Sequence, residues 1–350
     1  MSSELIHFKV RNKKVFKIAH GARTHTDTLL LKLEKDGIVA YGEAAHVPYY
    51  GIDIKDSIAD IAKHWGEIYP LVGKDAAVFW DKVRDLLGEN HFAICALDMA
   101  HQDWLSKSKG VDLRAHLGIA KEMQTPKSSY TIGIDEVEKM KQSVDEIDFP
   151  FLKIKLGSEN DAEILKALRE HSDKPMRVDV NAGWQLAQAK EMLQLMHTLG
   201  NFELLEQAFP IREIEGNLQL KEMNLLPVFV DESCVSKEDV RRVAPYVDGI
   251  NIKLTKCGGP TPAMEMIKTC RELGLKIMLG CMMESSIGIS TLAQLACLVD
   301  FVDMDGSSMI ANDPADGVKI VKGEAVFNDR LGHGAVLKDD IDYERKVTLR

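Results

Sequence analysis

The chain has 350 residues, of which 45% are hydrophobic and 28% are charged, and its formal net charge is −10 at pH 7. This is the composition of an ordinary globular protein, and it excludes collagen-like, coiled-coil and disordered chains. The acidic balance argues against a nucleic-acid partner. The longest uncharged stretch, residues 285–299, is too short and too polar to cross a membrane, so we expect no membrane partner.

The cysteines and the N-terminus predict the cellular compartment. The six cysteines form no CxxC pair and no framework spacing. The N-terminal sequence MSSELIHFKV lacks the basic head and apolar core of a signal peptide. We therefore expect a reduced, cytoplasmic protein.

Residues 1–125 predict a small α+β domain. Strand-like runs (HFKV, KVFKIA, THTDTLLLKLEKDG, IVAYGEA) come first, with a turn at Asp36-Gly37. Residues 54–109 then carry apolar side chains at helical spacing. Strands followed by helices, without alternation, are typical of an α+β unit. We expect residues 327–350 to return to this unit and complete it as a capping domain.

Residues 126–326 predict a (β/α)8 barrel. Eight short apolar runs alternate with helical stretches, and the last inward polar positions of the runs fall near residues 133, 155, 179, 206, 231, 253, 281 and 303. A step of 22 to 28 residues, repeated through eight strands, is the pattern of a barrel of this kind. A doubly wound open sheet is the alternative, but it gives no reason for the count of eight.

Three consecutive predicted strands end in carboxylates: Asp179 in MRVDVNA, Glu206 in FELLEQ and Asp231 in VFVDES. Adjacent strands lie about 4.8 Å apart, so these side chains should converge and repel one another unless a cation lies between them. All-oxygen ligation favours a hard ion, Mg²⁺ before Mn²⁺ or Ca²⁺. The alternative is that each carboxylate caps a helix or pairs with a lysine, which is less plausible for three in a row.

Lysines end the strands on either side of these carboxylates. Lys153 and Lys155 in FLKIKLG are two apart and point the same way, and Lys253 ends GINIKL. An ordinary lysine, with a pKa of about 10.4, is a poor base at neutral pH. A neighbouring ammonium and a divalent cation should lower that pKa. The alternative is a salt-bridge network in which the lysines only neutralise the carboxylates.

The last predicted strand adds Asp303 and Asp305 in FVDMDG. They lie too far round the barrel to join the first cluster, so we expect them to bind a second metal or a substrate ammonium, with a solvated loop acid as the alternative for Asp305. No histidine occurs between His197 and His333, which leaves strands five to eight without a histidine base. No GxSxG, GxGxxG or GxxxxGK[ST] motif occurs, so nucleophilic triads and nucleotide cofactors have no support.

Six motifs, taken in order, resemble the enolase superfamily, its muconate-lactonizing subgroup, and within that subgroup the dipeptide epimerases. The motifs are KIK, DVNAGW, LLEQ, VDES, NIKLTKCGG and GCMMESSIG. The resemblance implies an enolase-type barrel with an N-terminal α+β cap. It also implies an isomerase that uses a lysine base and Mg²⁺ to form an enediolate.

The resemblance further implies roles for the strand-end residues. One Mg²⁺ per subunit, which Mn²⁺ could replace, would be held by the three strand-end carboxylates. Lys155 and Lys253 would exchange the α-proton on opposite faces, with help from Lys153, and so invert the C-terminal residue of an L-Ala-D/L-Xaa dipeptide. The substrate amino group would meet Asp303 and Asp305. Asn181 and Glu232 match the family but are expected behind the ligands.

One position departs from the family pattern. In epimerases that act on Ala-Glu, an arginine in the loop after the first strands resembles a clamp for the glutamate side chain. Here the loop HGARTHTD carries Arg23, displaced by about two positions. It could aim a guanidinium at an acidic side chain, or it could leave an apolar pocket lined by Met282 and Met283.

Other functions remain open from the sequence. A muconate-type cycloisomerase or o-succinylbenzoate synthase resembles this chain in its lysines and ligands, but Asp303 and Asp305 would be unused or repulsive toward a substrate without an ammonium group. Acid-sugar dehydratases tend to need a histidine from the later strands. A non-catalytic barrel that binds a metal and a peptide would leave opposed lysines unexplained. The family resemblance also allows a homo-oligomer.

Overall fold

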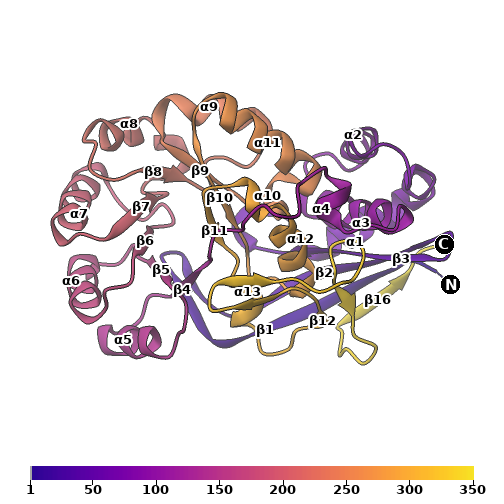
Figure 1. The fold of residues 1–350 in the computed structure, drawn as a ribbon, viewed down its shortest axis with the longest axis horizontal. Coiled ribbons are helices and arrows are strands. Elements are labelled where there is room, and N and C mark those ends of the chain that lie inside the picture. The colour runs from indigo at the N-terminus through magenta and orange to yellow at the C-terminus, as the bar shows by residue number, and fades with distance from the viewer. Residues whose placement is uncertain (1) are drawn as a thin grey trace.

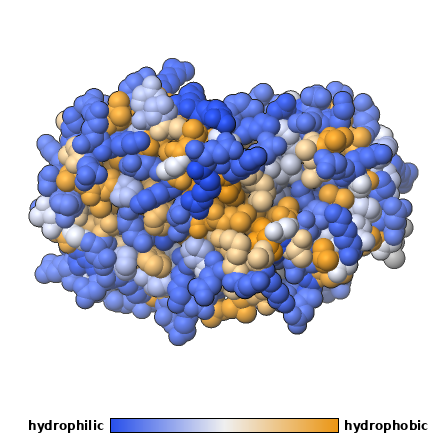
Figure 2. Space-filling view, turned by 45° about the horizontal axis from the view of Figure 1, so that its top comes forward, coloured by the Kyte–Doolittle hydropathy of each residue, from blue (hydrophilic) through white to orange (hydrophobic). Residues whose placement is uncertain are grey.

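Two sheets organise residues 2–350, the part of the chain that this computed structural model describes. A four-stranded antiparallel sheet with its helices and an eight-stranded parallel barrel lie beside each other (Figure 1). The capped barrel predicted from the sequence is therefore confirmed. Hydrophilic residues cover most of the face in Figure 2, and hydrophobic ones gather towards its middle.

The antiparallel sheet has the strand order β16-β1-β2-β3. Its strands are β1 (Glu4–Ile18), β2 (Gly21–Lys35), β3 (Ile38–Ala45) and β16 (Arg345–Thr348). At the predicted turn, Asp36 and Gly37 both have positive φ, 53° and 76°, as a two-residue hairpin turn requires. Because β16 pairs with β1, the two ends of the chain lie together (Figure 1).

Four helices belong to the cap: α1 (Ile54–Ile68), α2 (Ala76–Leu87), α3 (His91–Ser108) and α4 (Leu113–His116). Of these, α1 and α3 pack on the sheet. In α1 the residues Ile54, Ile58, Ile61 and Trp65 are buried, a spacing that forms one apolar stripe. The helix α3 packs on β3 and is buried along most of its length, so it lies between the sheet and the barrel.

The barrel strands follow one another in chain order, and all neighbours are parallel. They are β4 (Ser129–Ile132), β5 (Phe151–Lys155), β6 (Met176–Asp179), β7 (Phe202–Glu206), β8 (Val228–Val230), β9 (Gly249–Ile252), β10 (Lys276–Gly280) and β11 (Phe301–Asp303). The helices that follow them are α5 (Val137–Asp145), α6 (Asp161–His171), α7 (Leu186–Leu199), α8 (Glu215–Glu222), α9 (Lys237–Val243), α10 (Leu254–Cys257), α11 (Pro260–Glu272), α12 (Ser286–Leu295) and α13 (Gly306–Met309). The short strands β12 (Ala315–Asp316), β13 (Lys319–Val321), β14 (Glu324–Val326) and β15 (Val336–Leu337) lie between α13 and β16. Within residues 2–350, every helix falls short of the length and apolar character that crossing a membrane requires.

Side chains, rather than a strand ladder, close the barrel between β11 and β4. A single isolated bridge, Ser128 to Val302, joins the two edges within the described residues. Arg177 on β6 donates from Nη1 to the Val302 carbonyl at 2.6 Å and to Ser129 Oγ at 3.3 Å. Its guanidinium also lies over the rings of Phe151 and Phe301. One buried arginine therefore ties both edges of the seam.

The β1–β2 hairpin extends across the open end of the barrel. Ile134, after β4, donates its backbone N–H to the Lys17 carbonyl at 2.9 Å. Arg23 pairs with Phe16 near the end of this hairpin, so it belongs to β2. The expectation that Arg23 lies in a loop is therefore wrong, because the strands continue past a register shift between Arg11 and Phe16.

Buried carboxylates join the cap to the barrel helices. Asp98 on α3 accepts hydrogen bonds from Thr261 N at 2.8 Å and Thr261 Oγ1 at 2.7 Å, at the start of α11. Glu43 on β3 accepts from Ser285 N and Gly288 N, both at 2.8 Å, at the start of α12. Burial raises the pKa of Asp98 to about 7, and burial together with Glu284 raises that of Glu43 to about 8.

We predict that, between pH 5 and pH 8, the free energy of unfolding falls less in Asp98→Asn than in the wild type. Between pH 5 and pH 8 the unfolded chain holds Asp98 ionised, whereas the folded protein holds on to its proton up to about pH 7. The unfolded state therefore binds fewer protons, and the wild-type free energy of unfolding falls with pH, by about 2–3 kcal/mol from this group. Urea unfolding of both proteins at pH 5 and pH 8 measures the difference.

The control is Asp85→Asn, at an exposed position of α2, which should leave the pH dependence of stability as in the wild type. An unchanged pH dependence in Asp98→Asn would mean that the bonds from Thr261 keep the Asp98 carboxylate ionised in the folded protein.

Candidate active site

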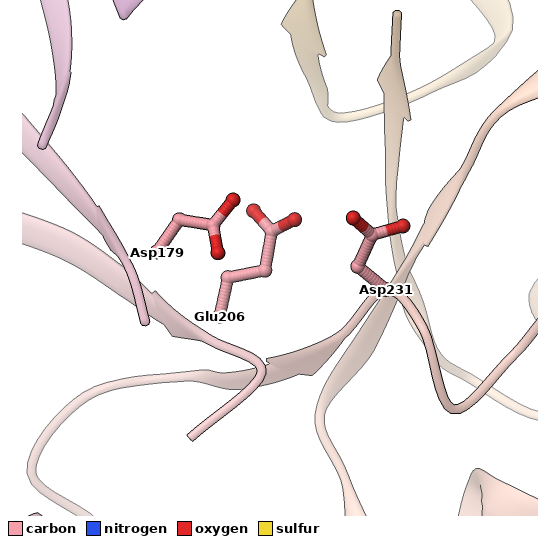
Figure 3. A group of neighbouring side chains, drawn as sticks. All are labelled: Asp179, Glu206 and Asp231. Carbon is pink, nitrogen blue, oxygen red and sulfur yellow. The ribbon is translucent and has the colours of Figure 1, made fainter. Parts of the chain in front are cut away.

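Three buried carboxylates meet at the carboxyl ends of neighbouring barrel strands. Asp179 ends β6, Glu206 ends β7 and Asp231 directly follows β8. One oxygen from each lies within 4.8 Å of the other two, and Figure 3 shows the three side chains turned toward a common region. The structure thus brings together the three residues that the sequence predicted as metal ligands.

Hydrogen bonds orient each of these carboxylates. Asp179 Oδ1 accepts from Asn181 N at 3.0 Å, and Glu206 Oε1 accepts from Asn251 Nδ2 at 2.7 Å. Asp231 Oδ1 accepts from Lys256 Nζ, and the backbone N–H of Asp231 donates to Gln207 Oε1 at 2.8 Å. The oxygens that face one another are therefore fixed in direction before any ligand binds.

The three predicted lysines surround the carboxylates. Lys153 Nζ lies 3.1 Å from Asp179 and 2.9 Å from Glu206, between two of the acids. Lys155 Nζ lies 2.6 Å from Asp179 Oδ2 on one flank, and Lys253 Nζ lies 2.8 Å from Asp231 Oδ2 on the other. Because β6, β7 and β8 separate β5 from β9, the two flanking lysines approach from opposite sides.

The ionisation of these groups follows from their mutual attraction. Burial lowers the pKa of Lys253, but the attraction of Asp231 outweighs burial and the net shift is upward. The pKa of Lys153 is likewise raised by its acidic neighbours against the effect of burial. Burial raises the pKa of Asp179, but Lys155 and Lys153 lower it to about 2. The lower pKa that the sequence leads us to expect therefore requires, at Lys253 and Lys153, a cation that neutralises these carboxylates.

The chemistry of the cluster fits a hard divalent cation. The candidate ligands are all carboxylate oxygens and all buried, the donor set that Mg²⁺ prefers. Glu206 Oε2 is buried and accepts no hydrogen bond within residues 2–350, although Lys153 Nζ forms an ion pair with it at 2.9 Å. Burial raises the pKa of Glu206, and Asp179 raises it further. Contact with a metal ion would therefore stabilise the ionised form of Glu206.

A pocket lies next to the three carboxylates. Asp303 and Asp305 line it from the side where β11 and β4 meet. Asp303 accepts from Ser129 Oγ at 3.1 Å and pairs with Lys153 Nζ at 2.8 Å, so Lys153 links it to the carboxylate cluster. Asp305 accepts from Thr131 N at 2.6 Å. Burial, and then the charge of Asp303, raise the pKa of Asp305 to about 7. Such a carboxyl would be stabilised in its ionised form by a cationic ligand.

A pocket above the carboxylates contains most of the other predicted residues. Its cap wall includes Phe16, Ile18, Arg23 and Tyr50. The predicted site residues that line it are Arg23, Lys153, Lys155, Asn181, Asp231, Glu232, Lys253, Met282, Met283, Asp303 and Asp305. Asp179 and Glu206 are fully buried behind these residues.

Asn181 and Glu232 extend the cluster on the Lys155 side. Lys155 Nζ donates to Asn181 Oδ1 at 3.1 Å, and Asn181 Nδ2 donates to Glu232 Oε1 at 3.0 Å. Asn181 has φ of 46°, in the left-handed region that asparagine tolerates better than most residues. Burial, followed by the nearby charge of Asp231, raises the pKa of Glu232 to about 7. Asn181 therefore contacts Lys155 directly, and Glu232 holds Asn181 from the other side.

Comparison with known proteins identifies the family. Residues 135–341 match the family model described as enolase C-terminal domain-like. The chain belongs to the enolase superfamily. It is 36% identical over 330 residues to the L-Ala-D/L-amino acid epimerase of Flavobacterium johnsoniae, a match that covers 94% of this chain and 98% of the relative. It is 38% identical over 338 residues to the L-Ala-D/L-amino acid epimerase of a Maribacter species, covering 96% and 99%.

A solved structure gives the same result. The dipeptide epimerase from Enterococcus faecalis, complexed with Mg and the dipeptide L-Leu-L-Tyr, aligns with a TM-score of 0.87 at 27% identity, covering 95% of this chain and 98% of that one. The resemblance inferred from the six sequence motifs is thus confirmed at the level of the family.

Several residues of this enolase-superfamily site were missed in the sequence. Asn251 holds Glu206, Gln207 holds Asp231 N, and Lys256 contacts Asp231. One signal was available, because Asn251 on β9 lies two residues before Lys253, which follows the strand in extended conformation, so both side chains point to the same side. The bonds of Gln207 and Lys256 depend on turns after their strands, which no local spacing reveals.

We predict that Gly280→Ala weakens Mg²⁺ binding by about 10- to 100-fold, the usual effect of disturbing a residue that orients a ligand. A Cβ at Gly280 would lie 2.5 Å from Asn251 Oδ1 and 2.8 Å from Asn251 Nδ2, so the amide that holds Glu206 must move. Titration calorimetry of the metal-free protein with Mg²⁺ measures the affinity.

The matched control is Gly66→Ala in α1, where an added Cβ meets open space. It should leave Mg²⁺ binding unchanged. Wild-type affinity in Gly280→Ala would show that Glu206 does not need the Asn251 amide.

Proposed function

We propose that this chain is a Mg²⁺-dependent dipeptide epimerase that inverts the α-carbon of the C-terminal residue of L-Ala-D/L-Xaa dipeptides. The observation that carries the proposal is the pair of lysines, Lys155 and Lys253, on opposite flanks of a buried carboxylate cluster. Two bases that face one carbon from opposite sides are what inversion by proton transfer requires. The named activities of the relatives support the same reaction class.

Asp179, Glu206 and Asp231 hold the metal in this proposal. When bound, Mg²⁺ would supply positive charge that neutralises the carboxylates, lowers the pKa of Lys253 and stabilises an enediolate. Lys153, buried among the acids, places a further positive charge beside the substrate carboxylate.

The flanking lysines carry the proton. One of them, neutral at its Nζ, takes the α-proton as the C–H bond breaks, and the electron pair passes into the substrate carboxylate. The other, protonated, returns a proton to the opposite face of the same carbon. The net change is inversion, with one lysine left protonated and the other neutral. The configuration of the substrate decides whether Lys155 or Lys253 acts as the base.

The ends of the dipeptide have matching partners. The substrate amino group lies against Asp303 and Asp305, the two buried carboxyls at the barrel seam. The side chain of the C-terminal residue faces the cap wall, where Arg23 is half-buried and forms no ion pair with any residue of the described range 2–350. Burial lowers the pKa of Arg23, and an anion would offset that cost. We therefore favour an acidic side chain over an apolar one.

We predict that the wild-type protein inverts dipeptides and exchanges their α-hydrogen with solvent, and that Lys155→Met and Lys253→Met each lose inversion by at least about 100-fold. Each variant should still exchange the α-hydrogen of one epimer, and the two variants should differ in which epimer that is. Incubation of L-Ala-L-Xaa and L-Ala-D-Xaa with Mg²⁺ in deuterium oxide, followed by mass spectrometry, measures both processes.

Lys82→Met, at an exposed position of α2, is the control and should behave as the wild type. Inversion that survives in either active-site variant would contradict the two-base assignment. If no dipeptide exchanges its α-hydrogen with the wild-type protein, the epimerase proposal fails and a cycloisomerase with the same site takes its place.

We predict that Arg23→Met lowers kcat/KM for L-Ala-L-Glu by about 10- to 100-fold, the effect of losing a hydrogen bond to a charged group. Turnover of L-Ala-L-Leu should change little, because its side chain makes no use of the guanidinium. Lys17→Met removes one positive charge from the exposed side of the same hairpin and serves as the control. Equal losses on both dipeptides in Arg23→Met would show that Arg23 shapes the pocket without selecting acids.

A further inference from the structure

Lys256 is a fully buried lysine that neither the proposed reaction nor the sequence motifs assign a task. It lies in the short helix α10, three residues after Lys253, with 2% of its surface exposed. Its Nζ donates to Asp231 Oδ1 at 2.5 Å, to the Asp231 carbonyl at 2.6 Å, to the Asn251 carbonyl at 2.9 Å and to the Cys234 carbonyl at 3.2 Å. An ammonium has three donors, so all of them are engaged.

These contacts join two segments that carry the metal site. Asp231 and Cys234 belong to the segment after β8, and Asn251, whose side chain holds Glu206, belongs to β9. One ammonium therefore fixes the Asp231 carboxylate and the backbone that presents it, together with the strand that presents Asn251. From the other side, Gln207 Oε1 accepts from Asp231 N at 2.8 Å and from Ser233 N at 3.2 Å.

The two oxygens of Asp231 have different partners as a result. Oδ1 faces Lys256, whereas Oδ2 faces Lys253 at 2.8 Å on the pocket side. Rotation of this carboxylate would break the contact with Lys256 inside a closed, buried environment, where an unpaired charge is costly. Oδ2 is thereby held toward the common region of the three carboxylates.

We infer that Lys256 is a positioning residue that fixes Asp231 in its metal-binding orientation before the metal arrives, and this inference rests on the proposed Mg²⁺ site. A ligand already in place spends no free energy on ordering when the cation binds, which is the advantage of preorganisation.

A simpler role predicts the opposite result. If Lys256 only neutralised Asp231, its removal would leave the carboxylate more negative and the metal would bind more tightly. If Lys256 positions Asp231, its removal lets the carboxylate rotate and the metal binds more weakly. The sign of the change in affinity separates the two roles.

The test is Mn²⁺ binding to the metal-free full-length protein, followed by the electron paramagnetic resonance signal of the free ion. Lys256→Met, which keeps the length of the side chain without its charge, should bind Mn²⁺ about 10- to 100-fold more weakly than the wild type. The matched control is Lys107→Met. Lys107 also bridges an aspartate, Asp103 at 2.7 Å, and a backbone carbonyl, Val39 at 3.0 Å, but it does so in the cap. That control should bind Mn²⁺ as the wild type does.

A second variant, Lys256→Gln, keeps two N–H donors and covers the case in which Lys256→Met does not fold, as judged by circular dichroism. Weaker Mn²⁺ binding in whichever folded variant is measured supports positioning, and equal or tighter binding overturns it. Because the readout needs no dipeptide, failure of the epimerase reaction alone leaves it intact. A wild-type protein that binds no Mn²⁺ would overturn the metal site and this inference together.

Discussion

The structure depends on how three buried carboxylates are kept together. Asp179, Glu206 and Asp231 are withdrawn from water, and their oxygens converge within 4.8 Å. In the low dielectric of a barrel interior their mutual repulsion is much stronger than in solution. The lysines and hydrogen-bond donors around these carboxylates can be understood as a response to that charge.

The nearest response is a set of lysines, each with a different geometry. Lys153 lies between acids, Lys155 and Lys253 flank them on the pocket side, and Lys256 lies behind Asp231. All four lysines neutralise the carboxylates, but the position of each ammonium group decides what else that lysine can do. A lysine on the pocket side can reach a substrate, whereas one enclosed by four acceptors can only hold its neighbours.

Much of the barrel site could be predicted because its residues occupy equivalent places in a repeat. A near-constant step of strand and helix sets the strand ends, so Asp179, Glu206 and Asp231 could be located from spacing alone. The contact of Lys153 with Asp303 could not, because their 150-residue separation is spanned only when the barrel closes. The strand position of Arg23 could not be predicted either, because the length of this hairpin depends on pairing between strands and on an irregularity in register, which local composition does not reveal.

The seam explains why one pair of acids could be both structural and functional. β4 and β11 do not pair along a ladder within the described chain, so backbone groups at this edge need other partners. Asp305 accepts the N–H of Thr131, and Ser128 Oγ accepts that of Met304. A closed ladder would have used these donors and left no reason for a carboxyl to lie there. The gap in the barrel therefore brings acidic side chains to the pocket wall.

The cap also holds the barrel segment between β10 and α12, which lines the pocket. Glu43 on β3 binds the first turn of α12, directly after Met282 and Met283 on the pocket wall. The hairpin that carries Arg23 is joined through β2 to that same strand. The two pocket walls that carry Arg23 and the two methionines are thus connected through one sheet. A change of substrate preference at either wall must keep Glu43 in place, since losing its bonds at α12 would displace the opposite wall as well.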